Sequence, residues 1–327
     1  LWFRLPLMFA ALRYFILKPE AARTLVASWL LGVLGLVAVD TIWQFVTHVS
    51  LTGNPRIEHS QRLTGPFTSP KVGIFMGKLL LPCVGLCLVA ALMRKQAWLA
   101  LASLALLGGA VVTIIFTGER AAFITTALGC ATAAALMMMT EKRLRVPIVL
   151  AASLSIGAFI TLYNTSAWVH SRGSQMIEVI KHYPQSDYGQ LMQAAITMGK
   201  EHWLHGVGVH GFAALCPQLQ YGTYIFRGLH PHNIFGEWFA EAGAIGLVLF
   251  LAMIGVLLRE GLRALRGTTG IARVIPALAI GVLVQHFFPL MGMQSFFLNW
   301  SALLLWYSLA LVFAAMPTSR GVLPNVG

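Results

Sequence analysis

Residues that could carry acid–base chemistry gather directly before one long apolar run. The stretch Arg227-Gly228-Leu229-His230-Pro231-His232-Asn233 places two imidazoles, a guanidinium and an amide next to one another. An imidazole with an ordinary pKa of about 6.5 can accept a proton near neutral pH. His232 stands just before the predicted helix, whose positive dipole end disfavours the imidazolium and keeps the base neutral. We therefore predict that His232 is a general base and rank His230 second.

Two carboxylates follow within the first turns of that apolar run. Glu237 and Glu241 are one helical turn apart, so they share one face of the predicted helix. We expect Glu237 to bind substrate together with Arg227, His230 and Asn233. An ionisable residue at the end of a span can also simply reach water, and a purely structural loop role for His230 stays open.

Cations occur in two further turns between apolar runs. The turn Thr117-Gly118-Glu119-Arg120 holds a guanidinium at the mouth of a helix bundle, where it can bind a diphosphate through two parallel hydrogen bonds. Anchoring of Arg120 to lipid phosphates, or its pairing with Glu119, is the alternative. An earlier turn, rich in Gly and Pro, adds Arg62 and Lys71. These residues predict a cationic, histidine-containing site that suits a lipid-borne phosphate or diphosphate.

The composition indicates how these residues are positioned. Of 327 residues, 57% are hydrophobic and 10% are charged, whereas soluble domains contain about 45–50% and about 25%. Such a chain needs lipid, so we predict an all-α polytopic membrane protein. A helix that crosses a bilayer needs about 20 apolar residues. On this basis the predicted spans are 1–17 (in part), 24–46, 72–93, 97–116, 121–139, 146–163, 234–258, 274–290 and 296–315, which is about nine helices.

The net charge of +12 arises from short basic clusters between these runs, which indicates membrane topology rather than nucleic-acid binding. The side with denser Lys and Arg is expected to be cytoplasmic. Residues 1–163 then form spans with an outer loop at 48–71. Residues 164–233 form one large helical outer loop, and residues 234–327 form the last spans and a cytoplasmic tail. Because the sequence opens beside an apolar run, we expect about twelve spans in the complete protein.

Cysteines offer no further chemistry. Those at positions 83, 87, 130 and 216 lack the spacing of metal ligands, and three of them lie in apolar runs. We therefore expect neither a metal site nor a disulfide.

Several of the motifs together resemble the bacterial O-antigen ligases. The wider superfamily includes O-antigen polymerases and protein O-oligosaccharyltransferases. The most specific part is Leu229-His230-Pro231-His232-Asn233 with its continuation Glu241-Ala242-Gly243. The Arg120 turn, the run Arg62-Leu63-Thr64-Gly65-Pro66-Phe67 and the turn Gly206-Val207-Gly208 match as well. The resemblance covers about residues 55–255.

This resemblance implies a C-type glycosyltransferase-like protein in the bacterial inner membrane, with its site facing the periplasm. It implies transfer of O-antigen polysaccharide from undecaprenyl diphosphate to a sugar hydroxyl of the lipid A core, with inversion and without a metal or other cofactor. His232 would deprotonate the acceptor. Arg120 would bind the diphosphate and stabilise the charge that grows as it leaves. Arg62 and Arg227 are further candidates, and membrane lipids are the remaining partners.

One position departs from the family's pattern. Family members commonly carry an Arg at the start of the helix that precedes the Gly-Val-Gly turn, whereas this sequence has Asp187-Tyr188-Gly189-Gln190. Arg172, Lys181 or Arg227 could take its place.

Other functions stay open. The polymerase and the protein oligosaccharyltransferase differ from the ligase in the acceptor and not in the donor. A transporter of an anionic substrate is an alternative of another class, and it predicts broken helices with charges near mid-membrane.

Overall fold

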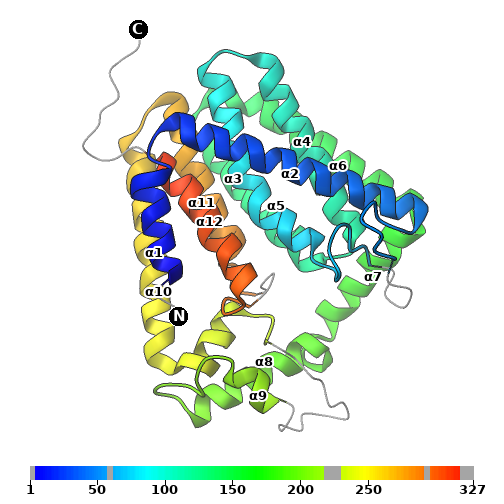
Figure 1. Cartoon of the computed structure of the whole chain (residues 1–327), viewed down its shortest axis with the longest axis vertical. Coiled ribbons are helices and arrows are strands. Elements are labelled where there is room, and N and C mark those ends of the chain that lie inside the picture. Colours follow the sequence, from blue (N-terminus) through cyan, green and yellow to red (C-terminus); the bar gives the residue numbers. More distant parts are fainter. Residues whose placement is uncertain (1–3, 57–61, 217–229, 291–294, 317–327) are drawn as a thin grey trace.

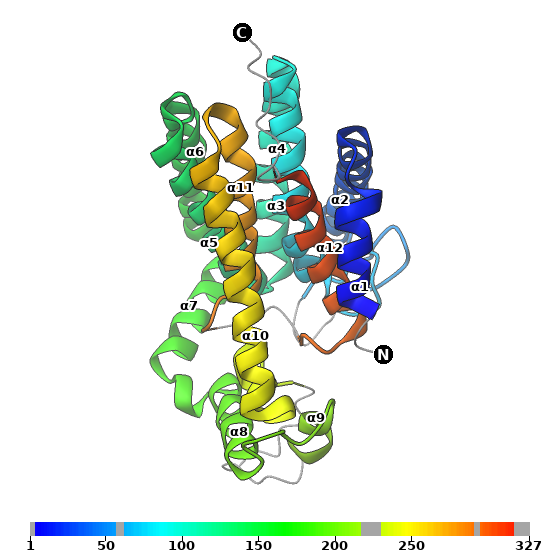
Figure 2. The same ribbon diagram turned by 90° about the vertical axis from the view of Figure 1, so that its left-hand side faces the viewer.

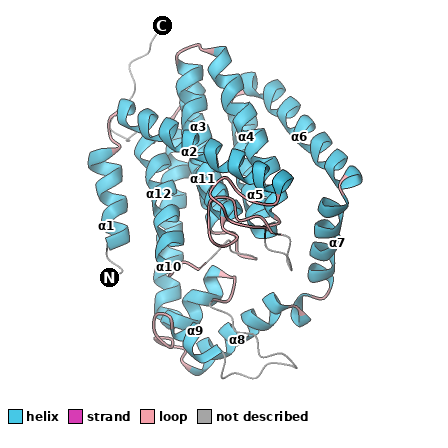
Figure 3. Ribbon diagram, turned by 45° about the vertical axis from the view of Figure 1, so that its right-hand side comes forward, coloured by secondary structure: helices cyan, strands magenta, loops and turns pink. Residues whose placement is uncertain are grey.

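A computed structural model shows a bundle of helices with a smaller group of helices at one end (Figure 1). It describes residues 4–56, 62–216, 230–290 and 295–316. In these ranges the regular structure is helical, and the only pairing of extended residues is an isolated bridge between Val49 and Pro55 (Figure 3). The predicted all-α fold is confirmed.

The helices follow the apolar runs closely. They are α1 (Arg4–Ala11), a π-helical turn (Leu12–Ile16), α2 (Glu20–Thr47), α3 (Val72–Met93), α4 (Ala97–Thr117), α5 (Arg120–Thr140), α6 (Arg145–Thr165), α7 (Ala167–Lys181), α8 (Asp187–Glu201), α9 (Gly211–Leu215), α10 (Ile234–Gly267), α11 (Val274–His286) and α12 (Asn299–Ala315). Short 3-10 turns occur at Lys142–Leu144, Tyr183–Gln185 and Gly270–Arg273.

Six segments are long and apolar enough to cross a membrane: α2, α3, α4, α5, α10 and Lys142–Thr165, which contains α6. They confirm a multi-pass membrane protein. The segments 270–286 and 300–315 are apolar but shorter. Among the described residues, six of the about nine predicted spans therefore coincide with a helix of spanning length, and the total number stays a prediction. α11 ends at His286 rather than at residue 290. Pro289 explains this end, because proline lacks an N–H and disfavours a helical conformation of the residue before it.

α3 is the centre of the bundle. In its most apolar window 83% of the residues are buried, whereas none is buried in the corresponding window of Lys142–Thr165. α3 contacts α2, α4, α5, α11 and α12, and α6 lies at the edge of the bundle (Figure 1). One face of α6 is therefore open to lipid.

The two ends of the bundle differ in charge and structure. The turns after α3, α5 and α10 lie at one end and carry basic clusters such as Arg94-Lys95 and Lys142-Arg143. The other end, which we call the loop end, holds residues 48–56 and 62–71, the α4–α5 turn and α7–α9. α8 and α9 extend beyond the spans there, beneath the start of α10 (Figure 2). The residues singled out for chemistry belong to the loop end.

α10 is broken near that end. Gly243 has φ 64° and ψ −165°, a conformation open essentially to glycine alone, and it separates residues 234–242 from the long remainder of the helix. The predicted span 234–258 is therefore not one continuous helix, and α10 also runs on to Gly267.

Backbone pairing with the turn at residues 203–208 accompanies the break. The N–H of Val207 donates to the carbonyl of Ala240 and that of Gly208 to Glu241, both at 2.9 Å, while Ala244 donates to Trp203 at 2.7 Å. Gly206 has φ 70° and lies so close to Glu241 that a side-chain carbon would overlap its carbonyl. The turn and the kink thus fit together backbone to backbone.

The fit predicts that Gly243→Ala destabilises the protein by at least about 1–3 kcal/mol, the range for one strained backbone position. A Cβ there would lie 2.5 Å from the backbone nitrogen of His205. Gly255→Ala is the matched control, because Gly255 is in the same helix and nothing lies within 4 Å of its added Cβ. Thermal unfolding in detergent measures both variants. Equal unfolding temperatures would contradict the role of the kink.

Candidate active site at the loop end

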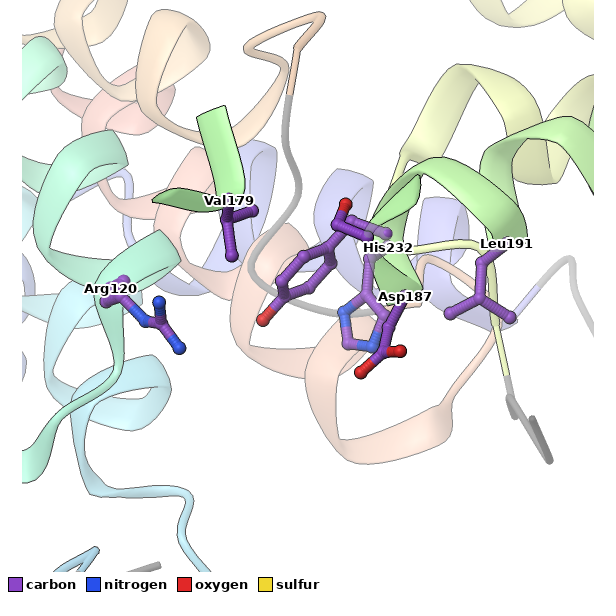
Figure 4. A pocket seen from close by; sticks show the side chains of 7 residues that line it. Arg120, Val179, Asp187, Leu191 and His232 are labelled. Carbon is purple, nitrogen blue, oxygen red and sulfur yellow. The ribbon is translucent and has the colours of Figure 1, made fainter. Parts of the chain in front are cut away.

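One pocket at the loop end contains both residues predicted to act on substrate. Arg120 at the start of α5 and His232 before α10 line it, with Val179, Ser186, Asp187, Tyr188 and Leu191 completing the wall. Its volume is about 180 Å³. Arg120 stands across the pocket from His232 and Asp187 (Figure 4). A guanidinium and an imidazole from distant parts of the chain therefore face one space.

The backbone around His232 is tightly constrained. His232 has φ 51°, in the left-handed region that few non-glycine residues adopt. Asn233 follows it and caps α10, because its Oδ1 accepts hydrogen bonds from the N–H groups of Phe235 and Gly236, each at 3.0 Å. Its Nδ2 donates to the carbonyl of Pro289 at 2.7 Å. Asn233 thus fixes the start of α10, directly after the residue that carries the imidazole.

Three rings lie together at this point. The centroid of the His232 ring is 4.1 Å from that of His230 and 5.2 Å from that of Tyr188, which meets it edge to face. His230 is buried, with 8% of its surface exposed. Within the described part of the chain, neither of its ring nitrogens has a hydrogen-bond partner. His230 does not line the pocket, so of the two histidines His232 is the one that a hydroxyl in the pocket meets.

Both imidazoles are neutral at physiological pH. Burial, followed by the charge of Arg62, lowers the pKa of His232 to about 4. Burial, then His232 and Lys78, lowers the pKa of His230 to about 3. Burial contributes most to the lowered pKa values, whereas the sequence argument relied on the helix dipole, and the role of His232 as a base stays a prediction.

The Arg120 turn is docked on the start of α3. Gly118 has φ 73°, which allows the sharp reversal between α4 and α5. The buried Glu119 carboxylate accepts the N–H of Gly73 at 3.2 Å and that of Ile74 at 2.9 Å. Arg62 Nη2 lies 4.0 Å from Glu119 Oε1, so the ion pair recorded for Glu119 among the described residues is with Arg62 and not with Arg120. The turn is held without neutralising Arg120.

Burial raises the pKa of Glu119 to about 7, although Arg62 and the two N–H groups favour the ionised carboxylate. Burial disfavours the ionised carboxylate of Glu119, and its three partners favour it. A pKa of about 7 means that the protonated and ionised forms are of similar stability near neutral pH.

Further arginines surround the turn. Burial is the main cause of a lowered pKa of Arg172 in α7, and the charges of Arg120, Arg62 and Arg56 lower it further. Arg172 lies over the Trp168 ring, with Cζ 5.4 Å from the centroid. Guanidinium groups gathered in this way favour an anionic ligand.

The other predicted binding residues are placed differently. Lys71 Nζ lies 5.2 Å from the Trp300 ring and does not line the pocket. Glu237 is buried and accepts hydrogen bonds from the Ser295 hydroxyl and, at 2.8 Å, from the N–H of Phe296. Glu241 accepts the N–H of His210 at 2.9 Å. Both carboxylates thus hold neighbouring loops in place. Arg227 lies outside the described residues.

Sequence reasoning missed Ser186, Asp187 and Tyr188 as site residues. They begin α8 at the position where the family's Arg is absent, and Ser186 caps that helix by accepting the N–H of Gly189 at 3.2 Å. Polar residues at a helix start are usually caps, so only their place before the Gly206 turn could have singled them out. No group of three or more His, Cys, Asp or Glu in the described ranges could hold a metal ion.

Comparison with known families gives one match. Residues 105–251 match the family model described as O-antigen ligase. The matched stretch includes Arg120, Tyr188 and His232. It also includes the 203–208 turn and the kink at Gly243, whose backbones pair. A search of curated proteins finds no match to this chain.

The docking of the turn predicts that Glu119→Ala destabilises the protein by about 1–3 kcal/mol for each buried N–H left without an acceptor. Glu119→Gln is the control, because it keeps one acceptor oxygen at the start of α3 and is expected to be less destabilised. Unfolding of both variants in the same detergent tests this order. If Glu119→Ala is as stable as Glu119→Gln, the carboxylate does not hold the turn.

Proposed function

We propose that this chain, which residues 105–251 place in the O-antigen ligase/polymerase superfamily, transfers a glycan from a lipid-linked diphosphate to a hydroxyl acceptor. The observation that carries the proposal is the single pocket lined by both Arg120 and His232. The pocket brings a cation for the departing diphosphate and a neutral base for the acceptor to opposite sides of one space.

His232 acts on the acceptor. A buried imidazole with its pKa lowered to about 4 is unprotonated at neutral pH and can take the hydroxyl proton. Its left-handed backbone and the Asn233 cap restrict where the ring can lie. Tyr188 packs edge-on against the ring, and the buried His230 ring packs on it as well, with centroids 4.1 Å apart.

Arg120 acts on the donor. The bond between the anomeric carbon and the diphosphate oxygen breaks as the acceptor oxygen bonds to that carbon, and the hydroxyl proton passes to His232. The diphosphate leaves with its electron pair, and a fixed guanidinium stabilises the growing charge. Arg62 is a further candidate for this role, as is Arg227. Attack from the side opposite the diphosphate inverts the anomeric carbon.

The basic turns support an orientation in which the loop end faces away from the cytoplasm. We infer an inner-membrane protein whose loop end faces the periplasm, with undecaprenyl diphosphate as the carrier and a sugar of the lipid A core as the acceptor. The break in α10 does not favour a transporter, because it lies at the loop end and pairs with the 203–208 turn rather than lining a site at mid-membrane.

The base assignment predicts that His232→Asn lowers glycan transfer by about 10²–10⁴-fold, the usual contribution of a general base. Asparagine tolerates the left-handed backbone but cannot take the proton at neutral pH. The complete protein is supplied with undecaprenyl-diphosphate-linked oligosaccharide and lipid A core, and products are identified by mass spectrometry. His48→Asn is the matched control, because His48 is exposed and also left-handed, with φ 66°.

The products of this assay also separate the related activities. Glycan joined to the core supports a ligase, whereas a longer glycan that remains on the carrier supports a polymerase. Near-normal transfer by His232→Asn would exclude His232 as the base. Transfer to no hydroxyl acceptor would refute the proposed activity.

The pH profile provides a separate prediction. His232 cannot accept a proton once it is protonated, so transfer should fall only as the pH drops toward about 4. Between pH 6 and 8 this group should cause no change, since its imidazole is neutral throughout. Measuring kcat/KM of the complete protein against pH locates the acidic limb. A limb centred near 6.5, the ordinary value for histidine, would contradict a buried base.

A further inference from the structure

The turn that pairs with the α10 kink carries two large apolar side chains on its outside. Trp203 is 62% exposed, and its neighbour Leu204 is 45% exposed. The residues around this pair are polar and exposed as well: Lys200, Glu201, His202 and His205. We call residues 200–205 the Trp203 tip. An indole with its polar N–H, set beside an aliphatic side chain among polar residues, is typical of the boundary between water and lipid.

We propose that the Trp203 tip is a membrane anchor, which inserts the indole and the Leu204 side chain into the boundary of the leaflet at the loop end. The occupant of this surface is the lipid of the bilayer that the spans cross. The inference stands on the position and exposure of these side chains, and it is independent of the proposed transfer reaction.

The tip is continuous with a surface of α10 that faces lipid. After the kink, exposed apolar residues recur at helical spacing on one side of this span: Ile245, Val248, Leu249 and Val256. The N–H of Ala244 donates to the carbonyl of Trp203 at 2.7 Å, and that of Ile245 donates to the carbonyl of Leu204 at 3.4 Å. Lipid that covers Ile245 therefore lies next to the backbone of the tip.

Contacts across the bundle indicate the depth of α10 in the membrane. α11 contacts both α5 and α10. Near its loop end, Gln285 Nε2 donates to Thr126 Oγ1 of α5 at 3.3 Å. Two residues further on, the Phe287 ring packs edge to face on the Phe250 ring of α10, with centroids 5.6 Å apart. Thr126 and Phe250 therefore lie at nearly the same depth.

The kink is level with the turn that ends two of the spans. α5 runs outward from Thr126 to Arg120, and α10 runs outward from Phe250 to Ala244, a rise of about 9 Å in each helix at about 1.5 Å per residue. Ala244 and its partner Trp203 are thus at the depth of the α4–α5 turn. Because α4 and α5 are long enough to cross a membrane, this is the depth at which hydrocarbon gives way to headgroups.

The basic end of α10 leads to the same conclusion. The straight part of the helix between the kink and the first exposed arginine, Arg259, comprises residues 244–258 and is about 22 Å long. The hydrocarbon core of a bilayer is about 30 Å thick. With Arg259 at one boundary of this core, the kink and the adjoining tip lie no further out than the opposite boundary.

The tip is also held in a fixed place. The backbone pairing of the 203–208 turn with α10 keeps Trp203 from turning inward. α8 packs beside α10 and ends at Glu201, within the tip, whereas its other end at Asp187 lines the pocket (Figure 2). α8 therefore has one end on the membrane and the other on the pocket, so the anchor sets the height of this wall above the bilayer.

Spin labels on the complete protein in phosphatidylcholine vesicles test the anchor. A nitroxide on Leu204→Cys collides with oxygen, which concentrates in lipid, or with a water-soluble nickel chelate, and power saturation measures both. Ile245→Cys on α10 is the lipid reference, and Gln185→Cys, exposed just before α8, is the matched water reference. The parent protein, treated with the same label, gives the background from its four cysteines.

The ratio of oxygen to nickel collisions at Leu204→Cys should lie closer to that at Ile245→Cys than to that at Gln185→Cys. Trp203→Cys should give the same result, so the test does not depend on one variant folding.

A ratio at Leu204→Cys equal to that at Gln185→Cys overturns the proposal, because the tip would then lie in water. Weak collisions with both probes also overturn it, since a second copy of the chain or another protein would then cover the tip. The measurement needs neither glycan donor nor acceptor, so its result is separate from that of the transfer assay.

Discussion

The backbone pairing between the 203–208 turn and the kink at Gly243 is the constraint on which the pocket depends. Gly206 and Gly243 both have positive φ. The backbone of Gly206 lies against that of Glu241, and the backbone of Gly243 lies against that of His205, and neither contact leaves room for a Cβ. The pairing joins the end of α8 to the start of α10. Since Tyr188 lies at one end of α8 and His232 precedes α10, the orientation of these two helices determines whether the rings meet.

A second link places the cationic side of the pocket. Glu119 uses its carboxylate to hold the start of α3 and to pair with Arg62, so the adjacent Arg120 keeps its full charge toward the pocket. Burial opposes the ionised carboxylate, and its partners favour it. The turn can therefore be buried while its carboxylate pairs with Arg62 rather than with Arg120.

The sequence predicted local features better than long-range ones. The α4–α5 turn was placed to within one residue, because strongly apolar runs flank a polar turn. The break at Gly243 was not predicted, since apolar residues continue on both sides and its cause is a turn distant in sequence. Glu237 and Glu241 suggested a binding face, but their partners, Phe296 and His210, are far away in the chain. Arg120 and His232 were predicted because their chemistry is recognisable without knowledge of their neighbours.

The two sides of the pocket belong to different parts of the molecule, and the proposed chemistry gives this division a physical reason. Arg120 starts a membrane span, where a lipid-linked donor is confined by its hydrocarbon. Tyr188 belongs to α8, beyond the spans, and His232 lies in the loop just before α10, where a hydrated sugar acceptor can arrive from water. Packing of α8 over His232 does two things at once: it closes the pocket, and the burial it provides keeps the imidazole neutral. The proposed base is therefore neutral at the place where the proposed donor and acceptor would meet.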